Sequence, residues 1–281
     1  MKIAVTGHQG FVGSELVRRG CIPIEGDILD EHDLYVANRD IAPDMVIHCA
    51  AMTNVDRCEE SPQEAFEVNV NGTMNVINEF CKCPIIYLST DHVFNGKYRL
   101  WLPDERTKPD PINMYGLTKY AGEVMMRTCT QPYLIVRSSK LFNLNSLKKD
   151  IYDLLRGEKK EYTGLIHRNF THLSHFVSML FLVANSGFEK NPKHDNFLHL
   201  ATPLSRSYYS FWNMVADRFG IDKSLITERR FSLPDVSPRP FRGGLDIKRV
   251  QLYSPLYTVS DGLDLAYKEF EETFVRKELT E

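Results

Sequence analysis

The chain opens with a short apolar run and a glycine-rich turn, IAVTGHQGFVG, at residues 3–13. Residues 2–6 predict a buried strand, and residues 13–19 predict a helix. Three glycines spaced GxxGxxG lie in the turn: Gly7, Gly10 and Gly13. Glycines in this place let the backbone approach a pyrophosphate at the N-terminus of the helix. This order of strand, turn and helix therefore predicts a dinucleotide-binding βαβ unit.

The rest of the first half repeats this rhythm. Short β-branched runs at 45–50, 85–89 and 133–138 alternate with helical patterns at 62–81 and 115–129. Strands that alternate with helices favour βαβ units and a parallel sheet that is covered on both faces. We therefore predict an α/β fold with a Rossmann-like, doubly wound parallel sheet.

The second half of the chain is less regular. Its helical patterns lie at 148–158, 173–185, 208–219 and 261–278. One apolar run at 196–201 predicts a strand that returns to the main sheet. We expect residues 1–141 to form the dinucleotide-binding domain. Residues 142–281 are expected to form mainly a smaller, mostly helical substrate-binding lobe.

Composition excludes several classes of protein. The net charge of -3 leaves no excess of positive charge for phosphates, so nucleic acid is not an expected partner. The longest apolar run, 179–184, is far shorter than the roughly 20 residues that cross a bilayer, so no membrane span is expected. A signal-peptide core is not recognisable, and the six cysteines lack CxxC spacing. We expect a cytoplasmic protein with no metal site.

Two carboxylates lie near the distance at which dinucleotide-binding folds contact the adenosine ribose, about twenty residues past the glycines. They are Glu25 and Asp27. Glu25 ends the predicted second strand, where a carboxylate repels the 2′-phosphate of NADPH. Arg18 and Arg19 are close in sequence and favour the opposite choice. The sequence leaves the cofactor open between NADH and NADPH.

Tyr115 and Lys119 form the only YxxxK in the chain. At positions i and i+4 of a helix, their side chains project from one face. An adjacent ammonium favours the phenolate, so it is expected to lower the tyrosine pKa from its ordinary value of about 10. The tyrosine then becomes a better proton donor near neutral pH.

Thr90 and Asp91 follow the predicted strand at 85–89. In an open α/β sheet, this end of a strand faces the ligand crevice. The Thr90 hydroxyl can hydrogen-bond the substrate oxygen that Tyr115 protonates, while a nicotinamide delivers hydride to the carbon. We therefore predict that Thr90, Tyr115 and Lys119 are the catalytic residues.

These residues belong to a set of longer motifs. The motifs are TGHQGFVG at 6–13, GDILD at 26–30, HCAAMTNVDRCE at 48–59, LSTDHVFNG at 88–96, YGLTKYAGE at 115–123, and SPRP followed by GLD at 237–246. Nearly end to end, the chain resembles extended short-chain dehydrogenases, and more narrowly the dTDP-4-dehydrorhamnose reductase family. The combination of motifs is much more specific than any one of them.

The resemblance implies a role for each matching position. It implies catalysis by Thr90, Tyr115 and Lys119, with Lys119 also holding the nicotinamide ribose. It implies that Asp91 and Arg239 face a sugar nucleotide, where a guanidinium suits a pyrophosphate. The implied cofactor contacts, besides Tyr115 and Lys119, are Gly7, Gly10, Phe11, Val12, Gly13, Asp27, Ile28, Ala50, Ala51 and Thr53.

Two positions on the expected substrate side depart from the family. Lys140 stands where the family commonly has a tryptophan beside the sugar, which indicates a different substrate. His92 stands where these reductases usually have a tyrosine. A histidine titrates near neutral pH and can move a proton next to a ketone, which suggests an epimerase or a combined epimerase and reductase.

The leading hypothesis is NAD(P)H-dependent reduction of the 4-keto group of a nucleotide-linked 6-deoxy-4-ketohexose, with Tyr115 as the proton donor. One alternative is a sugar-nucleotide epimerase that uses His92. Another is a non-catalytic NAD(P)-binding regulatory subunit, as in methionine adenosyltransferase, because a fold does not imply an activity. The expected partner is the sugar-nucleotide substrate, and a homodimer is left open.

Overall fold

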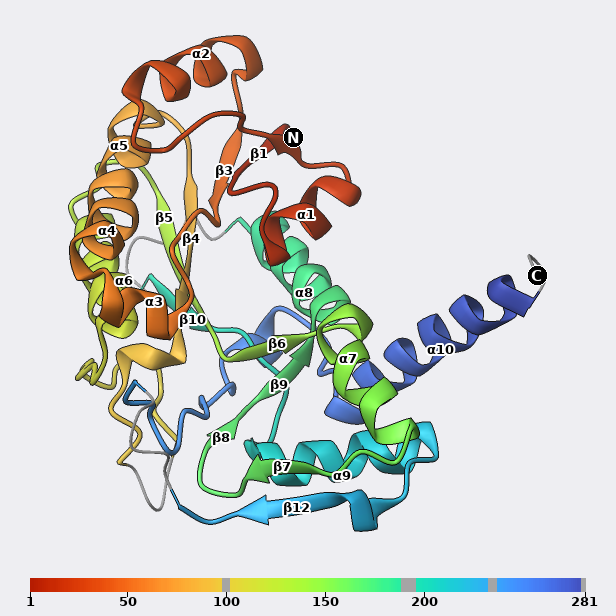
Figure 1. Ribbon diagram of the computed structural model, residues 1–281. Coiled ribbons are helices and arrows are strands. Elements are labelled where there is room, and N and C mark those ends of the chain that lie inside the picture. Colours follow the sequence, from red (N-terminus) through yellow and green to blue (C-terminus); the bar gives the residue numbers. More distant parts are fainter. Residues whose placement is uncertain (98–101, 188–195, 232–236, 279–281) are drawn as a thin grey trace.

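The computed structural model describes residues 1–97, 102–187, 196–231 and 237–278. Its centre is a parallel sheet of six strands in the order β10-β5-β4-β3-β1-β2, with helices on both faces (Figure 1). The Rossmann-like doubly wound sheet predicted from the sequence is therefore confirmed. The strands are β1 (Ile3–Thr6), β2 (Ile22–Pro23), β3 (Met45–His48), β4 (Ile85–Thr90), β5 (Tyr133–Ser138) and β10 (Phe197–His199).

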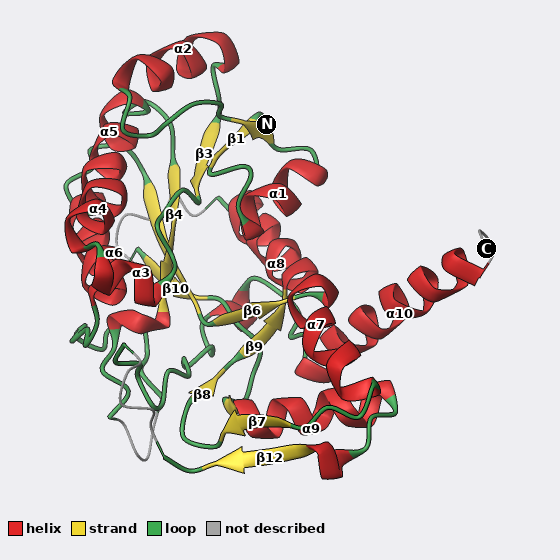
Figure 2. Ribbon diagram, in the orientation of Figure 1, coloured by secondary structure: helices red, strands yellow, loops and turns green. Residues whose placement is uncertain are grey.

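Two groups of helices bury the faces of this sheet. Alternate residues of each strand point to opposite faces, so successive side chains of β1 enter two different hydrophobic clusters. Figure 2 shows the helical layers on either side of the strands. One face packs against α1 (Phe11–Arg18) and α8 (Leu173–Asn185), and the other against α2 (Glu31–Ile41), α5 (Gly72–Glu79) and α6 (Met114–Met126).

The predicted helix at 62–81 is interrupted in the structure. α4 (Pro62–Phe66) continues into a π-helical turn at Glu67–Asn71 before α5 begins. The turn directs the buried amide of Asn69 towards the loop after β3, where it bonds both backbone groups of Met52 at 2.7 and 3.0 Å. The same amide donates to the Thr118 hydroxyl of α6 at 2.9 Å. The interruption therefore ties this loop to the helix that carries Tyr115 and Lys119.

The second half of the chain forms its own apolar core below the carboxyl ends of the sheet strands (Figure 1). Its helices are α7 (Leu144–Leu155), α9 (Tyr208–Phe219) and α10 (Val259–Glu278). Three two-stranded pairs, which the sequence did not predict, join them. They are β6 (Lys140–Phe142) with β9 (Phe170–His172), β7 (Lys160–Thr163) with β12 (Ile226–Arg229), and β8 (His167–Arg168) with β11 (Arg206–Ser207).

The strand order places β10 at an edge of the main sheet. Phe197, Leu198 and His199 pair in parallel with residues of β5, although about sixty positions separate the two strands. The chain therefore leaves the sheet after β5, builds the second core and comes back. None of the helices within the described ranges has the length and apolar character that a bilayer crossing requires.

Candidate active site

A cavity of about 730 Å³ lies between the carboxyl ends of the sheet strands and the second core. This volume is within the range of small-molecule and cofactor sites. The glycine turn and the ends of β3, β4 and β5 form one side of it, and residues of β7, β8 and β12 form the other. Open α/β sheets bind their ligands at this edge.

The backbone of the glycine turn packs directly against the loop after β3 and against itself, with no space for side chains at Gly7 and Gly13. The absence of side chains leaves the cavity side of the turn open to a ligand. Gly7 has a φ of +65°, and a Cβ there would lie 2.7 Å from the backbone of Ala50. A Cβ on Gly13 would collide with the carbonyl oxygen of Gly7. The first turn of α1 contains no acidic residue, so its free amides can receive a pyrophosphate. Gly7, Gly10, Phe11, Val12 and Gly13 all line the cavity.

The loop after β3 forms the next part of the cavity. Ala51 and Thr53 line it, and Ala50 lies against Gly7. The buried Thr6 hydroxyl accepts hydrogen bonds from the amides of Cys49 and Ala50 at 3.1 and 3.2 Å, which holds this loop beside the glycine turn. Sequence reasoning missed Thr6 because it looks like an ordinary strand residue.

The residues expected at the adenosine end of the cofactor follow β2 and do not line the cavity. Asp27 is exposed and its carboxylate accepts from the amide of Leu29 at 2.9 Å, while Ile28 is buried against Gly72. The Glu25 carboxylate lies 3.2 Å from Nε2 of His8, a residue of the glycine turn. Glu25 therefore faces the turn that would hold the pyrophosphate.

The two arginines that the sequence left as candidates for a 2′-phosphate are engaged elsewhere. Arg18 makes two hydrogen bonds to the Glu15 carboxylate, at 2.6 and 2.7 Å. Arg19 also bonds Glu15, at 2.7 Å, and donates to the hydroxyl of Ser178 on α8 at 2.8 Å. Arg19 therefore fastens α1 to α8.

Thr90 and Tyr115 both line the cavity. Thr90 ends β4, and its hydroxyl oxygen accepts from the amide of His92 at 3.2 Å. Tyr115 lies in the first turn of α6, which Asn113 caps by accepting from the amide of Gly116 at 2.8 Å. Burial raises the pKa of the Tyr115 phenol above its ordinary value, and a hydrogen bond to Thr90 opposes this rise.

Lys119 lies one turn further along α6 and is almost fully buried, with 3% of its surface exposed. Its Nζ is 4.0 Å from the centre of the Tyr87 ring, so the ammonium is held over the π face. Burial lowers the pKa of Lys119 to about 7, against the opposing charge of Glu123. The expected lowering of the Tyr115 pKa by an adjacent ammonium was wrong, because loss of water dominates at both side chains.

The lowered pKa of Lys119 predicts a pH dependence of stability. The folded state binds fewer protons than the unfolded chain between about 7 and the ordinary value of 10.5, so stability rises with pH across this window. We expect the free energy of unfolding to lose this slope in Lys119→Met, as measured by urea titrations at several pH values. The exposed Lys149→Met is the control and should retain the slope. An unchanged slope in Lys119→Met would refute the assignment.

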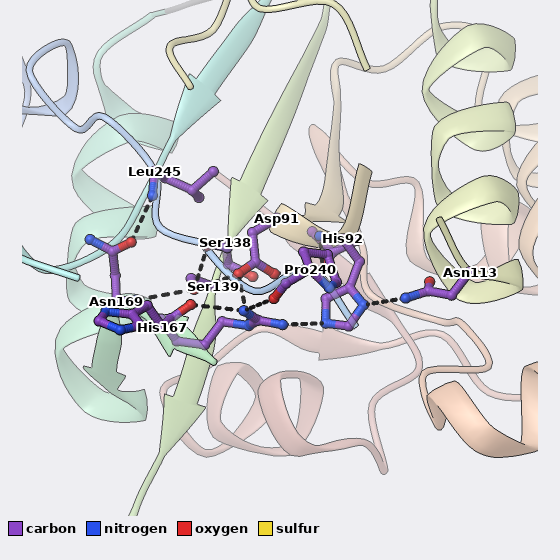
Figure 3. A network of polar contacts seen from close by, with 12 residues as sticks. Asp91, His92, Asn113, Ser138, Ser139, His167, Asn169, Pro240 and Leu245 are labelled. Carbon is purple, nitrogen blue, oxygen red and sulfur yellow. Dashed lines mark hydrogen bonds and ion pairs between the residues drawn. The ribbon is translucent and has the colours of Figure 1, made fainter. Parts of the chain in front are cut away.

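A buried polar network joins Asp91 and His92 to the second core (Figure 3). Asp91 is 2% exposed, and its carboxylate lies 3.2 Å from Nε of Arg168 and accepts from the Ser139 hydroxyl at 2.7 Å. The two ring nitrogens of His92 face two side chains. Nδ2 of Asn113 lies 3.0 Å from Nδ1 of His92, and Nη2 of Arg168 lies 3.3 Å from Nε2 of His92. Burial and then the charge of Arg168 lower the His92 pKa well below its ordinary value.

Arg168 is the main site residue that the sequence did not reveal. It lines the cavity together with Asp91 and His92, but no motif singles it out. Lys140 and Arg239, which were expected on the substrate side, also line the cavity. Lys140 is exposed, whereas Arg239 makes an ion pair of 2.7 Å with Asp56 of α3 (Val55–Glu60). Within the described ranges, no three His, Cys, Asp or Glu side chains are grouped to bind a metal ion.

The chain is similar to known proteins over most of its length. The family model described as the RmlD substrate binding domain matches residues 1–269. A dTDP-4-dehydrorhamnose reductase of Sinorhizobium fredii is 31% identical over 154 residues, which span 51% of this chain and 51% of that protein. The match thus spans about half the length of that relative.

Two further similarities differ in what they imply. The crystal structure of a dTDP-4-dehydrorhamnose reductase from Bacillus anthracis in complex with NADP has a TM-score of 0.83 and 24% identity. The similarity covers 96% of this chain and 100% of that one, so it shows the fold over the full length. Methionine adenosyltransferase 2 subunit beta of Danio rerio is 28% identical over 46% of this chain and 44% of that protein.

Proposed function

Since the chain belongs to the RmlD substrate binding domain family, we propose that it uses NADH or NADPH to reduce the 4-keto group of a nucleotide-linked 6-deoxy-4-ketohexose. The placement of Thr90, Tyr115 and Lys119 on the wall of one cavity, which begins at the glycine turn, carries the proposal. A phenol and a hydroxyl that meet in this way can bind one carbonyl oxygen together. The neighbouring Lys119 adds a cation of low pKa to the same wall.

Each of the cavity residues has a separate role in the proposed reduction. The amides around Gly7, Gly10 and Gly13 bind the pyrophosphate, and Lys119 orients the nicotinamide ribose. When bound, the reduced nicotinamide supplies a hydride to the carbonyl carbon. Tyr115 gives its proton to the oxygen. The Thr90 hydroxyl, which donates to Asp91 in the free protein, turns to donate to the same oxygen when the substrate binds. Lys140 and Arg239, which also line the cavity, are the residues proposed to contact the sugar nucleotide.

The direct test is turnover with a defined substrate. We expect the absorbance of NADH or NADPH to fall when dTDP-4-dehydrorhamnose is added to the purified protein. Because Lys140 departs from the family, UDP-, GDP- and CDP-linked keto-sugars belong in the same panel. Absence of turnover with every one of them would overturn the proposed reductase and would favour the regulatory-subunit alternative, which the similarity to the Danio rerio subunit suggests.

The epimerase alternative has less support. A base at His92 needs a free ring nitrogen, but Nδ1 and Nε2 both lie against donors, at 3.0 Å from Asn113 and 3.3 Å from Arg168. We therefore expect no deuterium from solvent to enter the carbon beside the ketone when reduced cofactor is left out. Wash-in that disappears in His92→Ala would restore this alternative.

The surroundings of β2 support a preference for NADH over NADPH. Glu25 and the exposed Asp27 bring negative charge to the adenosine end, while Arg18 and Arg19 are bound to Glu15. A 2′-phosphate there meets like charge, and the two arginines closest in sequence are already paired with Glu15. Glu25→Ser is expected to raise the affinity for NADPH relative to NADH by about tenfold.

Fluorescence titration with each cofactor measures this ratio without any substrate. Glu158→Ser removes an exposed carboxylate beyond α7, far from the glycine turn in the sequence, and is the control. It should leave the ratio of the two dissociation constants unchanged. If the wild-type protein binds NADPH more tightly than NADH, the charge argument at β2 is wrong.

A further inference from the structure

The buried guanidinium of Arg168 contacts four groups around the site. Its Nε lies 3.2 Å from the carboxylate of Asp91, and its Nη2 lies 3.3 Å from His92. Its Nη1 donates to the backbone carbonyls of His167 and Pro240, each at 2.8 Å. Arg168 is 3% exposed, so these contacts hold its guanidinium in a place that water hardly reaches.

Water has little access to the pair that Arg168 makes with Asp91. A Cβ on Gly243 would lie 2.7 Å from both Cζ of Arg168 and Oδ2 of Asp91, so the backbone of this loop covers the ion pair directly. In such surroundings a carboxyl group tends to keep its proton. Burial raises the pKa of Asp91, while the charge of Arg168 and hydrogen bonds from Ser139 and Thr90 lower it.

The charge of Asp91 decides which way the Thr90 hydroxyl points. Thr90 donates its single proton to Oδ1 of Asp91 at 3.3 Å and accepts from the amide of His92 at 3.2 Å. An ionised carboxylate can only accept, so it orients this proton and leaves a lone pair of the hydroxyl for Tyr115. A protonated Asp91 becomes a donor and competes for the same oxygen.

We propose that Arg168 is a positioning residue that keeps Asp91 in its carboxylate form and thereby orients the Thr90 hydroxyl beside Tyr115. The functional part of this inference rests on the role proposed for Thr90 in the reductase. Other titratable or charged groups also face the network: His92 beside Asp91, Tyr115 on α6, Lys140 on β6 and Arg239. Arg168 differs from them because it is in direct contact with the carboxylate.

Infrared spectroscopy of the resting protein tests the first step without substrate. Arg168→Gln is expected to show the carbonyl stretch of a protonated carboxyl group at neutral pH. The wild type, Arg168→Lys and the double variant Arg168→Gln/Asp91→Asn should lack this band. If the band does not appear in Arg168→Gln, the proposal is overturned whether or not the protein is a reductase.

The pH dependence of kcat tests the second step. We expect the acidic limb of the profile to move up by at least about one pH unit in Arg168→Gln, and to return towards its original position in Arg168→Lys. A uniform loss of kcat at every pH would show a merely structural role and would contradict the proposal. Absence of turnover in the wild type would instead refute the proposed function and leave the infrared result valid.

Two further variants keep the test decisive. Arg206→Gln removes the guanidinium of the residue that lies opposite Arg168 in the backbone register of β8 and β11, and Arg206 does not line the cavity. This control should show neither the infrared band nor the shifted limb. If Arg168→Gln does not fold, Ser139→Ala removes one hydrogen bond that lowers the pKa of Asp91, and a smaller shift in the same direction is expected. No shift in Ser139→Ala would then count against the proposal.

Discussion

Tyr115→Phe is expected to lower kcat by about 10²–10⁴-fold, the usual contribution of a positioned proton donor. The substitution removes only the phenolic oxygen of Tyr115, a residue that lines the cavity together with Thr90. The ring remains, so the edge contact with His92, at 5.4 Å between ring centres, should be kept. Steady-state turnover with the keto-sugar measures the loss, and fluorescence titration checks that the cofactor still binds.

Tyr120→Phe is the matched control because Tyr120 lies on the same helix and does not line the cavity. Its turnover should stay within a factor of about two of the wild type, as for most substitutions away from a site. If Tyr115→Phe keeps most of its activity, the proton must come from another group. The assignment of Thr90, Tyr115 and Lys119 as one catalytic set would then be lost.

The largest expected effect on stability is at Glu123, which ends the YGLTKYAGE motif. Its carboxylate makes two hydrogen bonds to Arg137 of β5, at 2.7 and 2.8 Å, and accepts from Ser89 of β4 at 2.6 Å. The side chains of Arg137 and Glu123 are 2% and 0% exposed. Glu123→Gln leaves the guanidinium uncompensated, so we expect the free energy of unfolding to fall by about 3–5 kcal/mol.

Urea denaturation of the two proteins measures this difference. An exposed ion pair supplies the control, since Arg57 and Glu64 contact each other with side chains that are 60% and 45% exposed. Glu64→Gln should change the free energy of unfolding by less than about 1 kcal/mol, because water screens such pairs. If Glu123→Gln and Glu64→Gln lowered the free energy of unfolding equally, burial would not make the ion pair of Glu123 more important for stability.

Local features of the sequence account well for the dinucleotide-binding half. The glycine turn was predictable because the spacing of Gly7, Gly10 and Gly13 leaves few other backbone solutions. The helix at 115–129 was predicted to within a few residues of α6, since its apolar pattern repeats over three turns. The three two-stranded pairs of the second half were missed, because strands of two to four residues carry no measurable period.

The polar network around Asp91 could not be predicted in the same way. Ser139 follows the strand next to β4, and Arg168 lies more than seventy positions from Asp91 in the sequence. Their approach depends on the parallel register that sets Thr90 beside Ser138, and on the chain that then passes through the second core. A sequence without aligned relatives gives no signal for such a pair.

The amino-acid sequence by itself determined the sheet, the glycine turn and the i, i+4 pairing of Tyr115 with Lys119, because each depends on residues that are near neighbours in the chain. Only the tertiary structure decided which groups lose their water and which charges meet. The ionisation of Lys119 and Asp91, and the hydrogen bond of Arg19 to α8, follow from those long-range contacts. Desolvation and charge pairing are properties of packed surroundings, so no local pattern specifies them.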